Sequence, residues 1–372
     1  MKNNLKLQNC RVCGNKFFKN PLLVYKNMPE KAQYFPEMKP SKLDKGINLN
    51  ILQCTGCGLV QLDNKPVNYY REVIRSTDVS GEMKQFRVKQ FSSFIEEYNL
   101  NGKKIIEIGC GKGEYLKIMQ QINKETYGLE FSEESVNSCL KENLIVFHGY
   151  IEEENFKIKK GPYKAFFILN FLEHLPNINI VLRGIYNNLT EDGVGLVEVP
   201  NFNMILEKKL FSEFMNDHLF YFTEETIKTA LKLNGFKIIA CETVWHDYVI
   251  SLTVKKLKRM QINEFYDHQN LIKKEIGSYI DKFKGKKVAI WGAGHQALAI
   301  ISLTGISDNI EYIVDSASFK QNKYTPSSYL PIFSPKKLKE NPIDAIIVMA
   351  ASFSDEIYYD LKNNFEGNFG IA

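Results

Sequence analysis

The sequence predicts an α/β protein in which two parallel β-sheets, each wound with helices, follow a small cysteine-containing lobe. Two Cys-x-x-Cys pairs near the N-terminus indicate the lobe, and a strand, glycine turn and helix beginning at residue 103 indicate the first sheet. The same pattern from residue 286 indicates the second sheet. A chain of 372 residues suits this division, because domains usually hold roughly 100–200 residues. We expect a metal-binding lobe over 1–68, a core with a lid over 69–254, a helical connector over 255–284 and a C-terminal Rossmann-like α/β domain over 285–372.

Composition and charge narrow the class of protein. Apolar residues make up 44% of the chain and charged residues 24%, which is typical of a soluble globular protein, and the net charge of +5 is mild. Short runs such as Lys336–Lys337 predict solvated faces rather than a nucleic-acid surface. No apolar stretch reaches the roughly 18 residues of a membrane span, and the first residues carry no apolar signal core. We therefore expect a cytoplasmic protein, monomeric or homodimeric, with no nucleic-acid or membrane partner.

Four of the seven cysteines form two pairs with the same spacing. They are Cys10, Cys13, Cys54 and Cys57. Cytoplasmic cysteines are poor candidates for disulfides. A two-residue spacer lets both thiolates turn back onto one ion, and Gly14 and Gly56 permit the tight backbone that this requires. Four soft sulfur ligands suit a closed, structural Zn²⁺ site, whereas unrelated buried cysteines or a redox pair explain the spacing less well.

Residues 103–109 predict a short buried strand, and a glycine-rich turn and a helix follow it. Gly109, Gly111 and Gly113 allow the backbone to approach a ligand closely. Glu107, at the end of the strand, is placed to contact the amino group of that ligand, directly or through water. This segment therefore predicts the opening of a nucleotide-binding unit.

The strands that follow predict the rest of the cofactor site. A second strand over 126–130 ends in Glu130, whose carboxylate can accept both ribose hydroxyls of an adenosine. A third strand is expected over 144–150, with a loop after it that usually meets the adenine, and a fourth over 165–170. The candidate cofactor-binding residues are Glu107, Gly109, Cys110, Gly111, Gly113, Glu130, Phe131, Tyr150 and Asn170.

The glycine spacing separates two classes of nucleotide-binding enzyme. A dinucleotide dehydrogenase would carry Gly-x-Gly-x-x-Gly, whereas residues 107–113 read Glu-x-Gly-x-Gly-x-Gly. The fourth strand opens into Asn-x-x-Glu-His-Leu-Pro over 170–176, which resembles the motif at this place in class I S-adenosylmethionine-dependent methyltransferases. The resemblance covers residues 100–240. It implies a class I methyltransferase fold that binds S-adenosylmethionine.

Two histidines are candidates for the base that such a transfer often needs. His174 follows the fourth strand, at the carboxyl edge where ligands lie in these sheets. His218 lies on a loop before a helix that Thr223 caps, and Asp217 beside it can orient it or stabilise its charge. The alternative is that either histidine is a hydrogen-bonded structural group. We expect His218, Asp217 and His174 to form the catalytic set.

Two further segments are candidates for the edge of the cleft. Tyr69, Tyr70 and the segment Arg75–Met83 can form a lid or part of the cofactor approach. Trp245-His246-Asp247 can also lie near the cleft.

The C-terminal part repeats the pattern of strand, glycine turn and helix. Residues 286–296 contain Gly292-Ala-Gly294, and further strands are expected over 311–315 and 344–349. The turn lacks a third glycine. We therefore expect a domain without a cofactor of its own that covers the substrate site; the alternative is that it holds the nucleotide of an activated substrate.

The order of these domains resembles the sugar C-methyltransferases of deoxysugar biosynthesis. The resemblance rests on the four cysteines, on the turn 107–113, and on Trp291–Gly294, Tyr312–Asp315 with Lys320, and Leu330–Pro335. It implies methylation of C3 of a nucleotide-linked keto sugar, after a base has taken the proton beside the ketone. His174 matches a histidine of that family.

Residues around the predicted active site depart from the family pattern. The family segment Tyr-His-Glu-His corresponds here to Met215–His218, so the last histidine is kept, the acid is shortened, and the tyrosine and first histidine are absent. A family tyrosine near the lid corresponds to Arg75.

Three functions are consistent with these observations. The first is methyl transfer to a nucleotide-activated sugar or glycan precursor. The second is O-methylation of a sugar or another small glycan modification, with His218 as base. The third is a non-catalytic binding or scaffold protein that keeps the fold, which the intact cofactor motifs disfavour.

Overall fold

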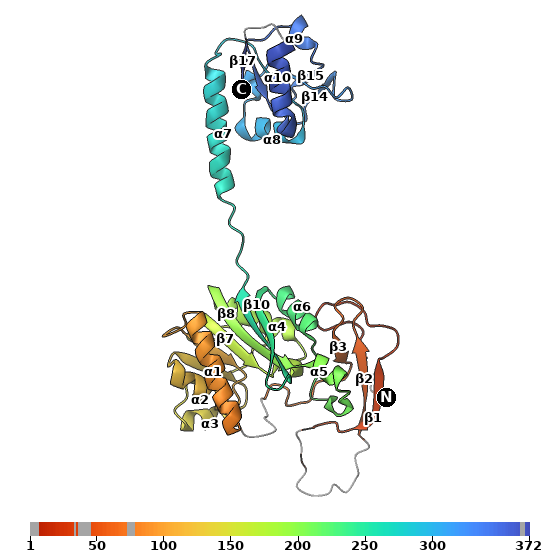
Figure 1. Ribbon diagram of the computed structural model, residues 1–372, viewed down its shortest axis with the longest axis vertical. Helices are drawn as coiled ribbons and strands as arrows, with labels where there is room; N and C mark the ends of the chain where they lie inside the picture. Colours follow the sequence, from red (N-terminus) through yellow and green to blue (C-terminus); the bar gives the residue numbers. More distant parts are fainter. Residues whose placement is uncertain (1–6, 33–34, 36–45, 73–78, 365–368) are drawn as a thin grey trace. The chain divides into compact units, whose positions relative to one another are not determined.

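The structure, a computed structural model, describes residues 7–32, 35, 46–72, 79–364 and 369–372 (Figure 1). The chain divides into two compact units, Met1–Lys258 and Arg259–Ala372. Arg75 and its neighbours up to Asp78, the first part of the candidate lid, lie outside the described residues.

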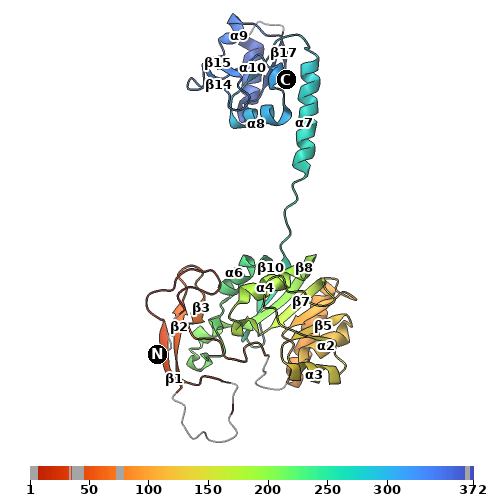
Figure 2. The ribbon, with the colours of Figure 1, turned by 180° about the vertical axis from the view of Figure 1, so that it is seen from behind.

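A seven-stranded sheet forms the centre of the first unit (Figure 2). Its strand order is β10-β11-β8-β7-β4-β5-β6, with β4 to β8 parallel and β11 antiparallel between β8 and β10. This arrangement confirms the predicted class I methyltransferase fold. The strands are β4 (Ile105–Ile108), β5 (Thr126–Glu130), β6 (Val146–His148), β7 (Tyr163–Leu169), β8 (Leu189–Pro200), β10 (Phe236–Val244) and β11 (Val249–Lys256).

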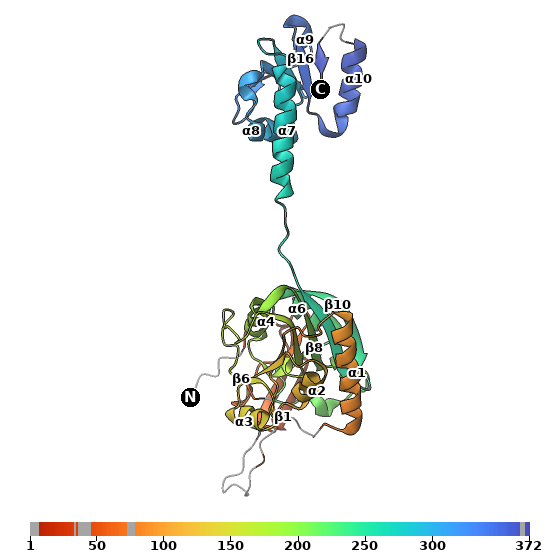
Figure 3. The same cartoon turned by 90° about the vertical axis from the view of Figure 1, so that its left-hand side faces the viewer.

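Helices cover both faces of this sheet (Figure 3). Successive side chains of a strand point to opposite faces, so Ile105 packs with Phe91 of α1, and Ile106 joins Leu182 of α4 in the other core. The helices of this unit are α1 (Gly81–Glu97), α2 (Glu114–Ile122), α3 (Glu133–Lys141), α4 (Ile178–Asn187), α5 (Phe202–Glu207) and α6 (Glu224–Leu233). As predicted, Thr223 caps α6, where its hydroxyl accepts from the Thr226 N–H.

A second, four-stranded antiparallel sheet joins the N-terminal lobe to the rest of the same unit. Its strands are β1 (Leu23–Met28), β2 (Ile47–Gln53), β3 (Val60–Leu62) and β9 (Phe220–Tyr221). The last strand comes from residues that the sequence assigns to the core. Val60 pairs with Tyr221, and both pack against α5 through Phe202. The lobe and the core therefore share one sheet.

The second unit is a smaller α/β domain around the six-stranded sheet β14-β15-β13-β12-β16-β17, in which only β14 is antiparallel to its neighbour. Its strands are β12 (Val288–Trp291), β13 (Tyr312–Val314), β14 (Lys323–Tyr324), β15 (Pro331–Phe333), β16 (Ala345–Val348) and β17 (Gly370–Ile371). Its helices are α7 (Glu264–Asp281), α8 (His295–Thr304), α9 (Lys337–Glu340) and α10 (Ser354–Asn364). The predicted second Rossmann-like unit is thus present.

Short 3₁₀ turns complete the described elements: η1 (Leu172–His174), η2 (Phe211–Glu213), η3 (Ser307–Asn309) and η4 (Ala351–Phe353). None of the helices in the described part of the chain combines the length and the apolar character needed to cross a bilayer.

Candidate active site and metal centre

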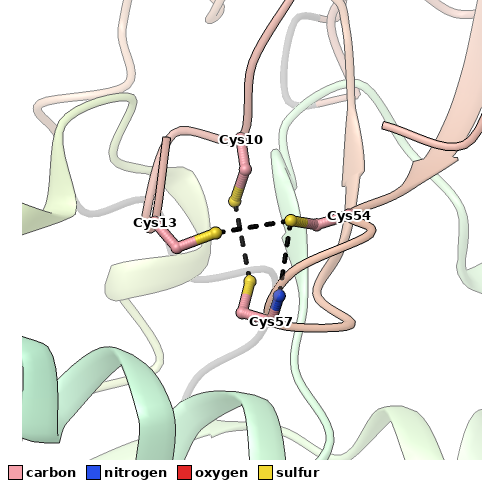
Figure 4. A group of neighbouring side chains, drawn as sticks. All are labelled: Cys10, Cys13, Cys54 and Cys57. Carbon is pink, nitrogen blue, oxygen red and sulfur yellow. Dashed lines mark hydrogen bonds between the residues drawn. The ribbon is translucent and has the colours of Figure 1, made fainter. Parts of the chain in front are cut away.

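The four paired cysteines meet at one point of the N-terminal lobe (Figure 4). The Sγ atoms of Cys10 and Cys57 lie 3.7 Å apart, and those of Cys13 and Cys54 lie 3.4 Å apart. Sulfurs at the corners of a tetrahedron around Zn²⁺, each about 2.3 Å from the ion, are about 3.8 Å apart. The donor set therefore fits the size and the chemistry of zinc.

The two knuckles have the same backbone shape. The N–H of Gly14 donates to the Cys10 carbonyl at 3.0 Å, and the N–H of Gly58 donates to the Cys54 carbonyl at 3.2 Å. Both residues have a φ of +75°, a left-handed backbone conformation that glycine adopts without steric cost. The second conformational glycine is thus Gly58 rather than the expected Gly56. Gly56 is needed for space, because a Cβ there would lie 2.2 Å from Nδ2 of Asn15.

The predicted glycine turn follows β4 at the carboxyl edge of the seven-stranded sheet. Gly109, Gly111 and Gly113 all have positive φ, and a Cβ on Gly113 would lie 2.5 Å from Leu144. Gly113 is the N-cap residue of α2, and Cys110 is buried behind the turn. Another residue at these positions would strain the backbone, so the turn depends on glycine, as a turn that approaches a cofactor closely does.

Glu130 ends β5 and faces this turn. Its two carboxylate oxygens accept the N–H groups of Gly111, at 2.8 Å, and Ser132, at 2.9 Å. Burial raises the pKa of Glu130, and these backbone donors partly offset the shift. The side chain is thereby held at the edge of the sheet, where the predicted ribose contact requires it.

The remaining candidate cofactor residues surround the same edge. Phe131 and Tyr150 are in ring contact at 6.2 Å. Asn170 follows β7 with φ of +50° and is tied to β8 by the Glu198 carbonyl, 2.9 Å from its backbone N–H. Glu107 is buried within β4, at 1% exposure.

The two predicted catalytic histidines lie in contact. The rings of His174 and His218 are nearly perpendicular, with centroids 4.7 Å apart, although the two residues lie 44 positions apart in the chain. Nδ1 of His174 lies 2.9 Å from the Asp217 carbonyl oxygen. A carbonyl can only accept, so Nδ1 carries the proton and Nε2 of a neutral His174 keeps its lone pair.

The electrostatics of this pair keep both imidazoles neutral. Burial lowers the pKa of His174, whereas the Asp217 carbonyl and carboxylate oppose that shift. Burial, and then the neighbouring His174, lower the pKa of His218 well below its ordinary value. Both rings therefore have a free lone pair near neutral pH, which a proton acceptor needs.

Asp217 does not have the orienting role that its place in the sequence suggests. Its carboxylate accepts the hydroxyl of Tyr69 at 2.7 Å and the N–H of Ala32 at 2.9 Å. The hydrogen bond to the histidine pair comes from the backbone carbonyl of Asp217 rather than from its carboxylate. The side chain instead joins the loop that carries His218 to two other segments of the first unit.

A buried acid lies beside the histidines, in the Glu173-His174 step that the sequence places after the fourth strand. Glu173 is 1% exposed, and its Oε1 lies 3.9 Å from Nε2 of His174. Burial raises its pKa to about 8. The signal was present in the Glu-His step itself, but the sequence did not show that this carboxyl group turns inward.

Other histidines lie elsewhere. Nε2 of His148 contacts the Phe131 carbonyl at 2.8 Å. The segment 245–247 forms the turn between β10 and β11, where His246 contacts Glu82 of α1 at 3.4 Å.

Two protein families match the chain. Residues 81–240 match the methyltransferase domain, and residues 253–370 match the C-methyltransferase C-terminal domain. A curated relative, C-methyltransferase NovU of Streptomyces niveus, is 22% identical over 97% of this chain and 93% of its own length.

Solved structures with related folds cover about half of the chain. A S-adenosylmethionine-dependent methyltransferase from Clostridium acetobutylicum ATCC 824 is 15% identical and covers 50% of this chain and 94% of its own, with a TM-score of 0.40. Magnesium protoporphyrin IX methyltransferase from Synechocystis PCC 6803, with bound SAH, is 16% identical and covers 49% of this chain and 90% of its own, with a TM-score of 0.39.

The sheet order, the glycine turn and the family matches together define a S-adenosylmethionine-dependent methyltransferase. The C-terminal match and the relative that spans nearly the whole chain carry the assignment further. The chain is similar to the C-methyltransferases over nearly its whole length, which confirms the resemblance that its sequence motifs predicted.

Proposed function

We propose that this enzyme transfers a methyl group to a carbon atom of a nucleotide-linked keto sugar. The observation that carries the proposal is the contact between His174 and His218, two neutral imidazoles at the carboxyl edge of the cofactor sheet. A carbon beside a ketone becomes a nucleophile only after it loses a proton, so this chemistry needs a base. The similarity to the C-methyltransferase NovU over 97% of the chain supports carbon as the acceptor atom.

In this proposal S-adenosylmethionine supplies a methyl group on a positively charged sulfur. Glu130 would hold the ribose, and Gly109, Gly111 and Gly113 would line the cofactor. The remaining contacts would come from Glu107, Cys110, Phe131, Tyr150 and Asn170. The four cysteines would hold one structural zinc ion, because four protein ligands leave no open position for chemistry.

His218 is the base in this scheme. Its lone pair takes the proton beside the ketone, and the electron pair of the broken C–H bond forms the new C–C bond. The positive charge that leaves the sulfur therefore reappears on the imidazole. His174 lies beside this base as a second neutral imidazole, and Asp217 holds the loop that presents both.

The proposed division of the chain is the one expected from the sequence: lobe over 1–68, core over 69–254, connector over 255–284 and C-terminal domain over 285–372. The substrate in this scheme is a small soluble molecule, and no nucleic acid takes part.

Solvent exchange tests the base and the acceptor atom together. The enzyme is incubated in D₂O with a nucleotide-linked keto sugar and without a methyl donor, and the mass of the sugar is followed. We expect the mass to rise by one through exchange of the hydrogen beside the ketone. His218→Asn should slow this exchange by about 10²–10⁴-fold, whereas His246→Asn, which changes an exposed histidine, should leave it unchanged.

Two results would overturn the proposal. One is methyl transfer without any solvent exchange. The other is an NMR spectrum that places the new methyl group on oxygen, which would support the O-methyltransferase alternative.

A further inference from the structure

An arginine side chain is enclosed by aromatic rings at the edge of the cofactor sheet. The guanidinium carbon of Arg71 lies 5.4 Å from the ring centre of Tyr70 and 5.2 Å from those of Phe131 and Tyr150. Its Nε donates to the Tyr70 hydroxyl at 3.0 Å, and Nη1 pairs with Glu152 at 2.9 Å. The side chain is 34% exposed, so one side of the group is open to water.

This aromatic cage lies where the base of the cofactor should be. The same small pocket is lined by Gly109 and by Leu129, the residue before Glu130. If Glu130 holds the ribose, the attached adenine must extend past the end of β5 toward Phe131 and Tyr150. With Arg71 in place, the pocket holds no more than about one water molecule. Adenine and the guanidinium group cannot occupy it together.

We propose that Arg71 is a further residue of the cofactor site, whose guanidinium fills the adenine position in the free enzyme and is displaced when the cofactor binds. Both groups are flat and stack well on aromatic rings, so one cage can serve either. The exchange keeps the apolar faces of Phe131 and Tyr150 covered between turnovers. It also makes the cofactor compete with a side chain, which lowers the apparent affinity. The inference rests on the proposed role of Glu130 as the ribose contact.

Titration calorimetry with S-adenosylhomocysteine tests this exchange on the full chain. Arg71→Ala should bind S-adenosylhomocysteine about tenfold more tightly than the wild type, because the competitor is gone. Arg71→Lys keeps a cation without the planar group and should fall between the two. Glu152→Gln removes the ion pair that holds the guanidinium and should tighten binding by a smaller factor. Adenosine alone should show the same gains, because only the base is involved.

Lys117→Ala is the matched control. Lys117 lies on α2, is 52% exposed and pairs with Glu142 at 2.6 Å, so the change removes a positive charge without touching the cage or the glycine turn. The affinity of this variant for S-adenosylhomocysteine should stay within about twofold of the wild type.

The outcomes separate this inference from the proposed function. Weaker or unchanged binding by Arg71→Ala, with normal weakening by Glu130→Gln, would overturn only the exchange. Unchanged binding by Glu130→Gln would instead show that the cofactor lies elsewhere, and would overturn the cofactor site on which both rest.

Discussion

Removal of one hydroxyl group at Tyr69 should loosen the loop that carries Asp217 and His218 without altering either side chain. The hydroxyl donates to Asp217 at 2.7 Å, and the aspartate is only 3% exposed. In Tyr69→Phe, Oδ2 of Asp217 loses that donor, and hydrogen bonds to charged groups contribute about 1.5–3 kcal/mol. We therefore expect the first unit to lose about 2 kcal/mol of unfolding free energy. At a urea m-value of about 2.5 kcal/mol/M, the midpoint should fall by about 0.8 M.

The chain offers a fluorescent reporter for this measurement. It has two tryptophans, Trp245 in the first unit and Trp291 in the second. In a Trp291→Phe background, urea unfolding followed by fluorescence reports the first unit alone. Tyr248→Phe is the matched control, because its hydroxyl pairs with Glu213 at an exposed position and should shift the midpoint by less than about 0.2 M.

The same variants separate two roles for Asp217. If it anchors the loop, Tyr69→Phe lowers the midpoint and leaves the pH dependence of methyl transfer in place. A normal midpoint together with a shifted pH profile would refute this reasoning, because Asp217 would then act on the charge of His218.

Three further results are expected. The purified enzyme should carry one zinc ion per chain by mass spectrometry, and Cys54→Ser should lose it and lower the melting temperature of the first unit, since one thiolate ligand is missing. Glu130→Gln should weaken S-adenosylmethionine binding about 30-fold by calorimetry, because an amide N–H would face a backbone N–H of the turn. Glu173, whose pKa is raised to about 8 by burial, stabilises the fold as the neutral acid: its contribution is complete below the unfolded pKa near 4.5 and is lost as pH rises toward 8. Between pH 5.5 and 7.5 the wild type should therefore lose about 2–3 kcal/mol relative to Glu173→Gln, measured by urea midpoints; parallel curves would contradict the burial of a neutral carboxyl group.

Local signals made most of the fold predictable. Glycine turns, β-strand patterns and the Thr223 cap depend on neighbours within a few residues, and the structure has these elements within two or three residues of their expected places. The third strand is shorter than expected, Val146–His148 rather than 144–150, because Leu144 packs beside Gly113 and the Gly149 N–H turns to the Glu130 carbonyl.

The parts of the site that depend on distant residues were not predictable in the same way. Tyr69 and Asp217 are 148 residues apart in the chain, and nothing in either segment indicates the other. The adjacency of Asp217 and His218 suggested a partnership, whereas the backbone sends the two side chains in different directions. Arg71 likewise gave no signal, because its cage is built from three separate segments.

The pairing of β3 with β9 connects the cysteine cluster to the loop that carries His218. The backbone N–H of Leu62 donates to the carbonyl of Leu219 at 3.0 Å. Leu62 lies five residues after Cys57, and Leu219 is the residue after His218. A chain that began at residue 69 would leave Phe220–Tyr221 as an open edge with no neighbour to fix its register. Loss of the proposed zinc ion should therefore disturb the loop that carries His218, because the strand that follows the knuckles also fixes β9.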